Sequence, residues 1–287
     1  LAGTMDADYQ RLGQEFDQVM FPILTRDFGD PLALDSLTNN DQRIAMLFTP
    51  EVNARSANLL GFVSACDFFA PDAATWIGAS NQAEIFYARA ATNSTGTASD
   101  VNSRDGWFRY MRSTLVHETK HIASFAERIL RTPDDAPDLI LEESWLEEGT
   151  AQIAVELYAR TIYGAGLTWK GSALYRQTLY CDWSSRYALC GNPPILMLDH
   201  FAFLQDYLAN VDSKSFLSSG TADNDIYGSA WLFARWAADT YAQDEGAFFR
   251  ALVTDWQRAG IANIRARTNA TWDTMLANFM TALWATG

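Results

Sequence analysis

The chain has 287 residues, of which 48% are hydrophobic and 20% are charged, and its formal net charge is −14. This composition is typical of a globular protein with a sizeable core and excludes an intrinsically disordered chain. The negative charge argues against nucleic acid and anionic lipid as partners, and no apolar run is long enough to span a membrane.

The first hundred residues predict one or two helices and about three strands. Apolar residues recur at helical spacing over residues 6–28, and Pro22 should kink or split this helix. A polar loop follows at residues 92–105. Three apolar runs between the helix and the loop lie at residues 43–49, 59–69 and 83–89, and the first and last have strand-like composition.

The rest of the chain is predicted to be mainly helical. A long helix is expected over residues 106–131, and a proline-rich break at 133–137 separates it from a second helix over 139–163. Further helices are predicted at 169–180, 200–209, 227–241, 247–258 and 271–286. The pattern predicts an α+β fold, with an N-terminal lobe over residues 1–135 that holds a small mixed sheet, and a mainly helical C-terminal lobe over residues 136–287.

Two of the three histidines lie four residues apart on the predicted long helix. Residues 117–121 read His-Glu-Thr-Lys-His, the H-E-x-x-H pattern of zinc peptidases. Residues i and i+4 share one helix face, so His117 and His121 can bind one metal ion. Glu118 is offset, where it can take a proton from a water on that metal. The alternative is a surface helix on which Glu118 and Lys120 are simply solvated.

A catalytic zinc needs three protein ligands and one open position, so a third ligand should come from a neighbouring element. The next predicted helix carries four glutamates near its start, and an antiparallel pair of helices would bring them opposite the histidines. Glu147 and Glu148 are adjacent in an apolar context, and a nearby cation would offset their repulsion. The candidates are therefore Glu142, Glu143, Glu147 and Glu148.

Residues 145–151, Trp-Leu-Glu-Glu-Gly-Thr-Ala, are similar to the W-L-N-E-G-x-A segment of gluzincin metallopeptidases. That resemblance implies that Glu148 is the third zinc ligand and that Glu147 replaces the usual asparagine. Between His121 and Glu148 there are 26 residues, a longer interval than in thermolysin-like enzymes and aminopeptidases of the family. The chain also resembles the hyicolysin-type bacterial neutral peptidases, more loosely, at residues 28–29, 44–48 and 80–87. The resemblance implies a thermolysin-like zincin fold and a peptide or protein substrate.

Peptide hydrolysis also needs a hydrogen-bond donor for the oxyanion. The resemblance implies two candidates. Tyr227 begins a predicted helix, as does the catalytic tyrosine of gluzincin aminopeptidases, and His200 is the one histidine outside the motif, where thermolysin-like enzymes use a histidine. The alternatives are an aromatic residue packed on the core for Tyr227 and a histidine near a helix start for His200.

We therefore expect a zinc-dependent metallopeptidase in which Glu118 is the general base. Gluzincin aminopeptidases grip the free amine with a G-x-M-E-N segment, whereas residues 78–81 read Gly-Ala-Ser-Asn and Glu84 fits a strand better. An endopeptidase is thus favoured, with residues 85–88 as a sheet edge along which the substrate lies. The alternatives are an aminopeptidase, a metal-dependent hydrolase of other bonds, and an inactive zinc-bearing binding or surface protein.

The three cysteines bear on the cellular compartment. Cys181 and Cys190 are nine residues apart and compatible with a small disulfide loop, while Cys66 lies in an apolar run and is expected to be a buried thiol. The chain starts Leu-Ala-Gly, without an initiator Met or a signal peptide. We expect a processed, secreted or cell-envelope protein of bacteria whose targeting segment is absent from this chain.

Overall fold

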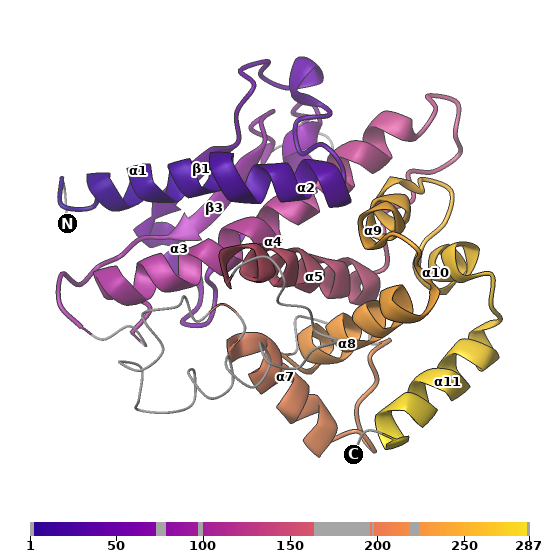
Figure 1. Cartoon of the computed structure of the whole chain (residues 1–287). Helices are drawn as coiled ribbons and strands as arrows, with labels where there is room; N and C mark the ends of the chain where they lie inside the picture. Colours follow the sequence, from indigo (N-terminus) through magenta and orange to yellow (C-terminus); the bar gives the residue numbers. More distant parts are fainter. Residues whose placement is uncertain are drawn as a thin grey trace.

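A small mixed sheet lies beside a set of packed helices in the computed structural model of the chain (Figure 1). The structure describes residues 3–72, 79–96, 100–163, 196, 198–217 and 224–285. The protein is of the α+β class, as the sequence predicts, and most of its described residues are helical. The predicted helix at 169–180 and the predicted Cys181–Cys190 disulfide lie outside the described residues.

The sheet has the strand order β1-β3-β2. β1 (Ala45–Thr49) is parallel to β3 (Ile85–Arg89), and β2 (Gly61–Phe62) is antiparallel to it. β3 is therefore the central strand, so the prediction that residues 85–88 form a substrate-binding edge is wrong. The apolar run at 59–69 forms only β2 and a 3₁₀ turn at Ala65–Phe68, and β2 is the edge on that side.

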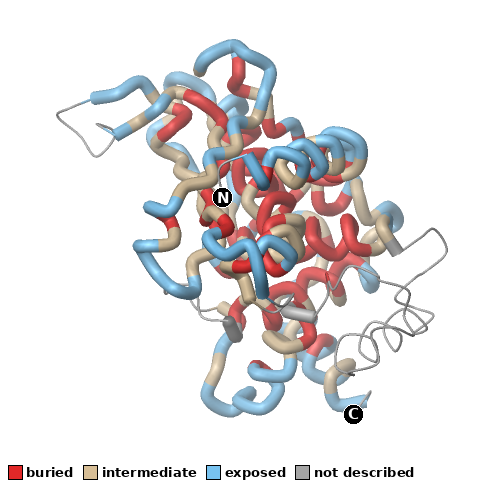
Figure 2. The backbone as a smooth tube through the Cα atoms, turned by 90° about the vertical axis from the view of Figure 1, so that its left-hand side faces the viewer, coloured by how far each residue is buried: buried red, intermediate tan, exposed pale blue. Residues whose placement is uncertain are grey.

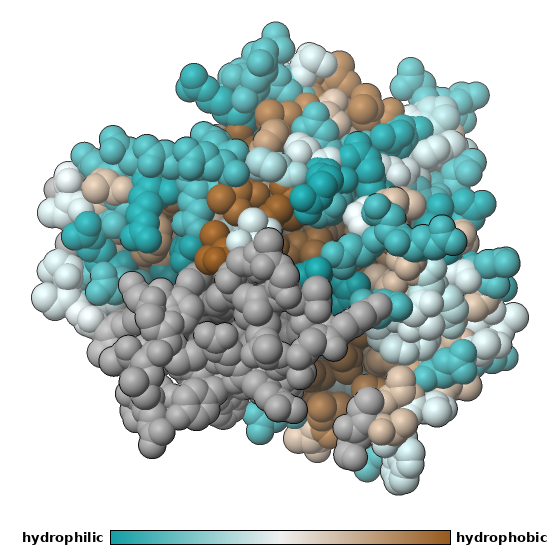
Figure 3. Space-filling view, in the orientation of Figure 1, coloured by the Kyte–Doolittle hydropathy of each residue, from teal (hydrophilic) through white to brown (hydrophobic). Residues whose placement is uncertain are grey.

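The predicted N-terminal helix is split near its proline. It consists of α1 (Asp6–Glu15), a π-helical turn (Phe16–Met20) and α2 (Phe21–Asp27). Pro22 lies in the first turn of α2, where its missing N–H costs little, and the wider π turn before it absorbs the change in hydrogen bonding. The outer surface of α1 is hydrophilic (Figure 3).

A short helix, α3 (Pro50–Arg55), follows β1 directly and is absent from the prediction. Thr49 caps it, because its hydroxyl accepts a hydrogen bond from the backbone N–H of Glu51 at 3.3 Å. Threonine at the cap and proline at the first helical position are a recognised start signal, which the sequence pattern contains. Pro50 thus ends the strand and begins a helix at the same point.

The long helix α4 (Arg104–Arg131) carries the H-E-x-x-H residues and begins two residues earlier than predicted. Ser103 caps it by accepting a hydrogen bond from the N–H of Gly106 at 3.1 Å. Trp107 is fully buried and donates its indole N–H to the carbonyl of Arg89 at 2.7 Å. This bond ties the helix to the end of β3. The predicted apolar face is buried at Met111, Leu115 and Ile122 and half-buried at Phe108, Phe125 and Ile129.

The second half of the described chain is helical, as predicted, with shifted boundaries. A predicted helix at 247–258 is wrong at its end, because Asp255 accepts a hydrogen bond from the N–H of Gln257 and closes a turn there. A separate helix then starts at Gly260, whose φ of +54° suits glycine. The helices are α5 (Ser144–Tyr163), α7 (Leu198–Ala209), α8 (Asn224–Tyr241), α9 (Glu245–Thr254), α10 (Gly260–Thr268) and α11 (Trp272–Ala285).

α5 is the centre of the packing. It contacts α4 on one side and α8 on another, and nearly all its residues from Trp145 to Ala159 are buried. Figure 2 shows the buried segments gathered in the middle of the molecule. A helix that is apolar on most of its surface must lie inside the protein, and α5 fits that rule. The main core cluster includes residues from both predicted lobes, from Met5 to Phe279. The predicted boundary between the lobes, at residues 135 and 136, stays a prediction.

Gly149 lets α5 and α8 approach closely. A Cβ atom at this position would lie 2.8 Å from the carbonyl carbon and oxygen of Ala230. We expect Gly149→Ala to reduce the free energy of unfolding by about 1–3 kcal/mol, because one of two packed helices must shift. Urea denaturation measures the change. Gly13→Ala on α1 is the matched control, because no atom lies within 4 Å of its new Cβ, and equal effects at both positions would contradict the packing argument.

Cys66 is a free thiol, but it is partly exposed and not buried, because the inward positions of its 3₁₀ turn are taken by Asp67 and Phe68. No helix in the described ranges combines the length and apolar character needed to cross a membrane.

Candidate metal centre

Three predicted ligands meet at the contact between α4 and α5. The Nε2 atoms of His117 and His121 are 3.1 Å apart. The Oε2 atom of Glu148 lies 3.1 Å from the first and 3.5 Å from the second. The two histidines are one turn apart on α4, and Glu148 is in the first turns of α5. The structure therefore brings the three residues together from segments far apart in the sequence.

This triangle of donor atoms has the dimensions of a zinc site. Zinc binds nitrogen and oxygen ligands at 2.0–2.2 Å, so two corners of its tetrahedron are about 3.4 Å apart. The three observed separations lie between 3.1 and 3.5 Å. Two imidazole nitrogens and one carboxylate oxygen are also a donor set that zinc accepts. The residues thus fit a zinc ion with a fourth coordination position open.

The charges around the triangle favour a cation. Burial by itself would raise the pKa of Glu148, but His121 and His117 hold it well below its usual range. Burial by itself would lower the pKa of His121, but Glu148 and Glu147 raise it to about 10. The carboxylates therefore stabilise positive charge at His121, and a divalent cation is stabilised by the same field.

Glu147 holds His121 from the other side. Its Oε1 atom lies 2.7 Å from Nδ1 of His121, so Nδ1–H donates to the carboxylate and Nε2 is directed toward His117 and Glu148. This is the usual arrangement around a metal-binding histidine, whose second nitrogen donates to a carboxylate or carbonyl. Glu147 therefore orients the ring of His121 and is not itself one of the three converging donors.

Lys120 completes this arrangement. Its ammonium group is fully buried, 2.8 Å from Oε2 of Glu147, and it donates to the backbone carbonyl of the same residue at 3.2 Å. Burial by itself would raise the pKa of Glu147, but Lys120 and His121 lower it to about 2. The alternative in which Lys120 is solvated is therefore wrong. A nearby cation was expected to offset the charge of Glu147, and Lys120 is such a cation. The role of Lys120 was not predicted from the sequence, although this residue stands next to His121 in the motif.

The other two glutamates of the segment have separate partners. Glu142 binds Arg128 at 2.8 Å and accepts a hydrogen bond from the amide of Asn263 at 2.7 Å. Glu143 accepts a hydrogen bond from the indole of Trp145 at 2.7 Å. Both glutamates thus serve the packing of α4, α5 and α10, and the structure does not bring them to the histidines.

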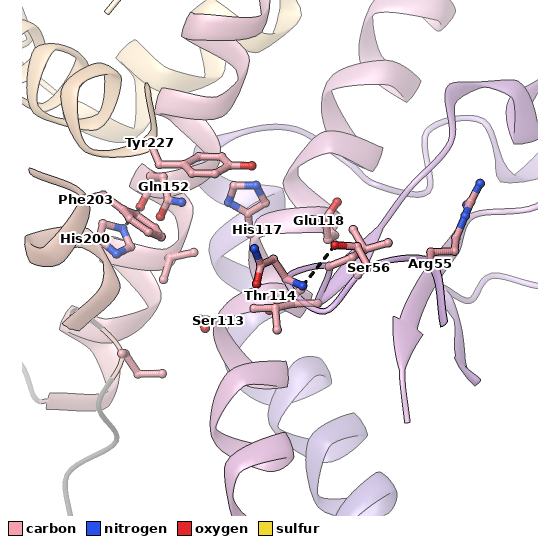
Figure 4. Close-up of a pocket in the computed structure, with 16 residues that line it drawn as sticks. Arg55, Ser56, Ser113, Thr114, His117, Glu118, Gln152, His200, Phe203 and Tyr227 are labelled. Atoms are coloured by element: carbon pink, nitrogen blue, oxygen red, sulfur yellow. Dashed lines mark hydrogen bonds between the residues drawn. The ribbon is translucent and has the colours of Figure 1, made fainter. Parts of the chain in front are cut away.

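A cavity of about 490 Å³ opens beside the metal centre (Figure 4). Glu118 lines it and is partly buried. Burial and the nearby charge of Glu148 raise the pKa of Glu118, against the opposing effect of both histidines. A carboxylate with a raised pKa at the wall of a cavity is suited to proton transfer. The other walls come from Arg55, Ser56 and residues 58–61, which precede and begin β2, from Ser113 and Thr114 of α4, and from residues of α5, α7 and α8.

Tyr227 lies next to the histidines. Its ring is edge-on to that of His117, with 5.8 Å between the ring centroids, and its side chain extends over His117 in Figure 4. Burial raises the pKa of the phenol, and the carboxylates of Glu148 and Glu118 raise it further. The phenol therefore stays protonated and is available as a hydrogen-bond donor.

His200 lines the same cavity but cannot donate to an oxyanion in this arrangement. Its Nε2 atom lies 2.9 Å from the backbone carbonyl of Gln152, which can only accept, so the ring proton is used there. Burial lowers the pKa of His200 to about 4, so the ring is neutral near pH 7. Of the two predicted oxyanion donors, Tyr227 is therefore the better placed.

No known protein family model and no curated protein matches this chain. The metal centre is inferred from the residues and their geometry.

Proposed function

We propose that this protein is a zinc-dependent metallopeptidase of the gluzincin kind, with His117, His121 and Glu148 as zinc ligands. The observation that supports this most strongly is the triangle of donor atoms, 3.1–3.5 Å on each side, at the wall of a cavity that Glu118 also lines. Structural zinc sites close all four positions with protein ligands, whereas catalytic sites use three and leave one open. The described residues offer three converging donors for a metal ion.

Zinc in this site would supply Lewis acidity, which acidifies a water molecule and polarises a carbonyl oxygen. Glu118 accepts a proton from the water that attacks the carbonyl carbon of the peptide, and it passes that proton to the leaving amine. Tyr227 donates its phenol hydrogen to the carbonyl oxygen as negative charge develops there. Glu147 keeps the ring of His121 in position through Nδ1.

An extended peptide is proposed to lie along β2 and not along β3. Residues 59–61 line the cavity, and β2 is an outer strand of the described sheet. An outer strand has free backbone groups that can pair with a peptide whatever its side chains. The mixed sheet beside α4 and the helical second half also support a thermolysin-like zincin fold as part of this proposal.

Endopeptidase activity is favoured over aminopeptidase activity by the surroundings of Glu84. This carboxylate, the candidate closest in sequence to residues 78–81, is fully buried and accepts a hydrogen bond from Thr38 at 2.9 Å. It is therefore engaged away from the cavity, which it does not line. An inactive zinc-bearing protein is the other candidate, but such a protein would not need a base at the position of Glu118.

Metal analysis together with a cleavage assay tests the proposal. We expect about one zinc ion per chain and cleavage of casein and of N-acetylated quenched peptides. A zinc chelator should remove both the metal and the cleavage, and added zinc should restore them. The N-acetylated peptides separate endopeptidase from aminopeptidase activity. A zinc-loaded protein that cleaves none of these substrates, or cleavage that persists without metal, would contradict the proposal.

A further inference from the structure

An arginine without a carboxylate partner stands at the rim of the cavity. Arg55 is the last residue of α3, and it is the one arginine or lysine among the described residues that line the cavity. Its side chain is exposed and forms no ion pair in the described part of the chain. Arg112, Arg128 and Arg235, by contrast, each bind a carboxylate. In a chain with 35 acidic and 21 basic side chains, an arginine left unpaired at a cavity is a candidate contact for a ligand.

The guanidinium of Arg55 is held over an aromatic ring of the sheet. Its Cζ atom lies 5.2 Å from the centroid of the Phe62 ring. Phe62 in turn stacks on Tyr87 of β3, with 5.0 Å between the ring centroids. A guanidinium above a ring keeps its N–H groups in its own plane, so they stay free to donate. The ring therefore positions Arg55 without using its hydrogen-bond donors.

This position lies beside the strand along which the peptide is proposed to bind. Phe62 belongs to β2, the outer strand of the described sheet. Side chains that face each other on paired strands are about 4.5–5.5 Å apart, so a peptide residue opposite Phe62 comes within reach of the guanidinium. In Figure 4, Glu118 lies between His117 and Arg55, and the Arg55 side chain extends away from Glu118. The contact is therefore remote from the bond that is cleaved.

The charges along the cavity favour an acidic group at this end. Ser56 and Asn58, which line the wall after Arg55, are neutral. The carboxylate among the described lining residues is Glu118, near the metal centre, where it repels an acidic group. Arg55 attracts an acidic group and repels a lysine or arginine of the peptide. A carboxylate also matches the planar fork of a guanidinium, with two parallel hydrogen bonds.

We propose that Arg55 binds a carboxylate of the substrate, so that the protein prefers acidic peptides. The carboxylate belongs either to an aspartate or glutamate side chain or to the C-terminus of a short peptide. The proposal rests on the proposed function, since it requires a peptide that lies on β2 beside the metal centre. The gain is modest because Arg55 is exposed, where an ion pair changes an equilibrium or a rate by up to about fivefold.

Matched peptides test the preference and identify the source of the carboxylate. The first set is N-acetylated, C-terminally amidated and quenched, with glutamate or glutamine at each position on either side of the cleaved bond. The second set has no acidic side chain and ends in a free carboxylate or an amide. With zinc-loaded protein, we expect kcat/KM to be about fivefold higher for the charged member of one set. Equal values of kcat/KM in every pair would overturn the proposal.

A charge reversal tests whether Arg55 is the residue responsible. Arg55→Glu should reverse the preference, so that a peptide with lysine at the same position is cleaved faster than its glutamate analogue. The ratio of kcat/KM for two peptides within one variant cancels any general loss of activity. If Arg55→Glu does not fold, Arg55→Gln should abolish the preference.

Arg43→Glu is the matched control. Arg43 is also an exposed arginine, but it does not line the cavity, and its replacement changes the net charge by the same amount. This variant should keep the preference of the unmodified protein. An equal change of preference in Arg43→Glu and Arg55→Glu would show a general effect of net charge and would contradict the local contact.

Peptide binding separates this proposal from the peptidase itself. Fluorescence anisotropy of labelled glutamate and glutamine peptides measures their affinity for the zinc-loaded protein without any need for turnover. Cleavage of both peptides at equal rates and with equal affinities would contradict the Arg55 contact and leave the peptidase standing. Tighter binding of the glutamate peptide, lost in Arg55→Gln, with no cleavage of either peptide would contradict the peptidase and leave a site for acidic peptides.

Discussion

Replacing Glu118 by glutamine is expected to lower zinc-dependent peptide cleavage about a thousandfold, because a general base contributes roughly 10²–10⁴ to the rate. The amide has nearly the same size as the carboxylate but cannot take up a proton. Zinc should remain bound, since Glu118 is not among the three residues whose donor atoms converge. The measurements are kcat/KM for a quenched peptide and the zinc content of the purified variant.

Glu143→Gln is the matched control for this experiment. Glu143 is an exposed glutamate that hydrogen-bonds Trp145 and lies away from the donor triangle. The control should retain near-normal cleavage and full zinc content. An unchanged rate in Glu118→Gln would refute its role as the base, and a loss of zinc in that variant would make Glu118 a ligand.

Replacing Glu147 should weaken zinc binding although this residue is not a ligand. Glu147→Leu removes the acceptor for Nδ1–H of His121, and loss of such a partner usually costs about 10–100-fold in metal affinity. Glu147→Gln should cost less, because its amide oxygen can still accept that hydrogen bond. Competition with a chromophoric zinc chelator measures the dissociation constants. The idea fails if Glu147→Leu binds zinc as tightly as the unmodified protein.

The same glutamate has a second role that involves Lys120. Glu147→Gln leaves a fully buried ammonium group without its carboxylate, and breaking a buried ion pair in this way typically costs about 3–5 kcal/mol. The double variant Lys120→Met with Glu147→Gln should recover much of that stability, because no unpaired charge remains. Urea denaturation of the metal-free proteins tests this separately from metal binding. A double variant no more stable than Glu147→Gln alone would show that the pair is not coupled.

The elements that local pattern controls were predictable. α4 was expected within two residues of its observed start, and the split of the first helix was expected at Pro22. Errors arose where a few side chains decide the outcome. The short helix α3 depends on the Thr49 cap, and the end of α9 depends on a turn closed by Asp255. The position of β3 in the sheet depends on which strands pair with it, which no local signal states.

The candidate site divides in the same way. The sequence by itself determined that His117 and His121 share a helix face with Glu118 beside them, because that follows from 3.6 residues per turn alone. The sequence limited the candidates for the third ligand to four glutamates, and the resemblance to gluzincins singled out Glu148. Only the tertiary structure decided that Glu147 binds His121 and Lys120, and that His200 donates its ring N–H to the carbonyl of Gln152. These outcomes depend on how α4, α5 and α7 pack, and packing is set by contacts between residues far apart in the chain.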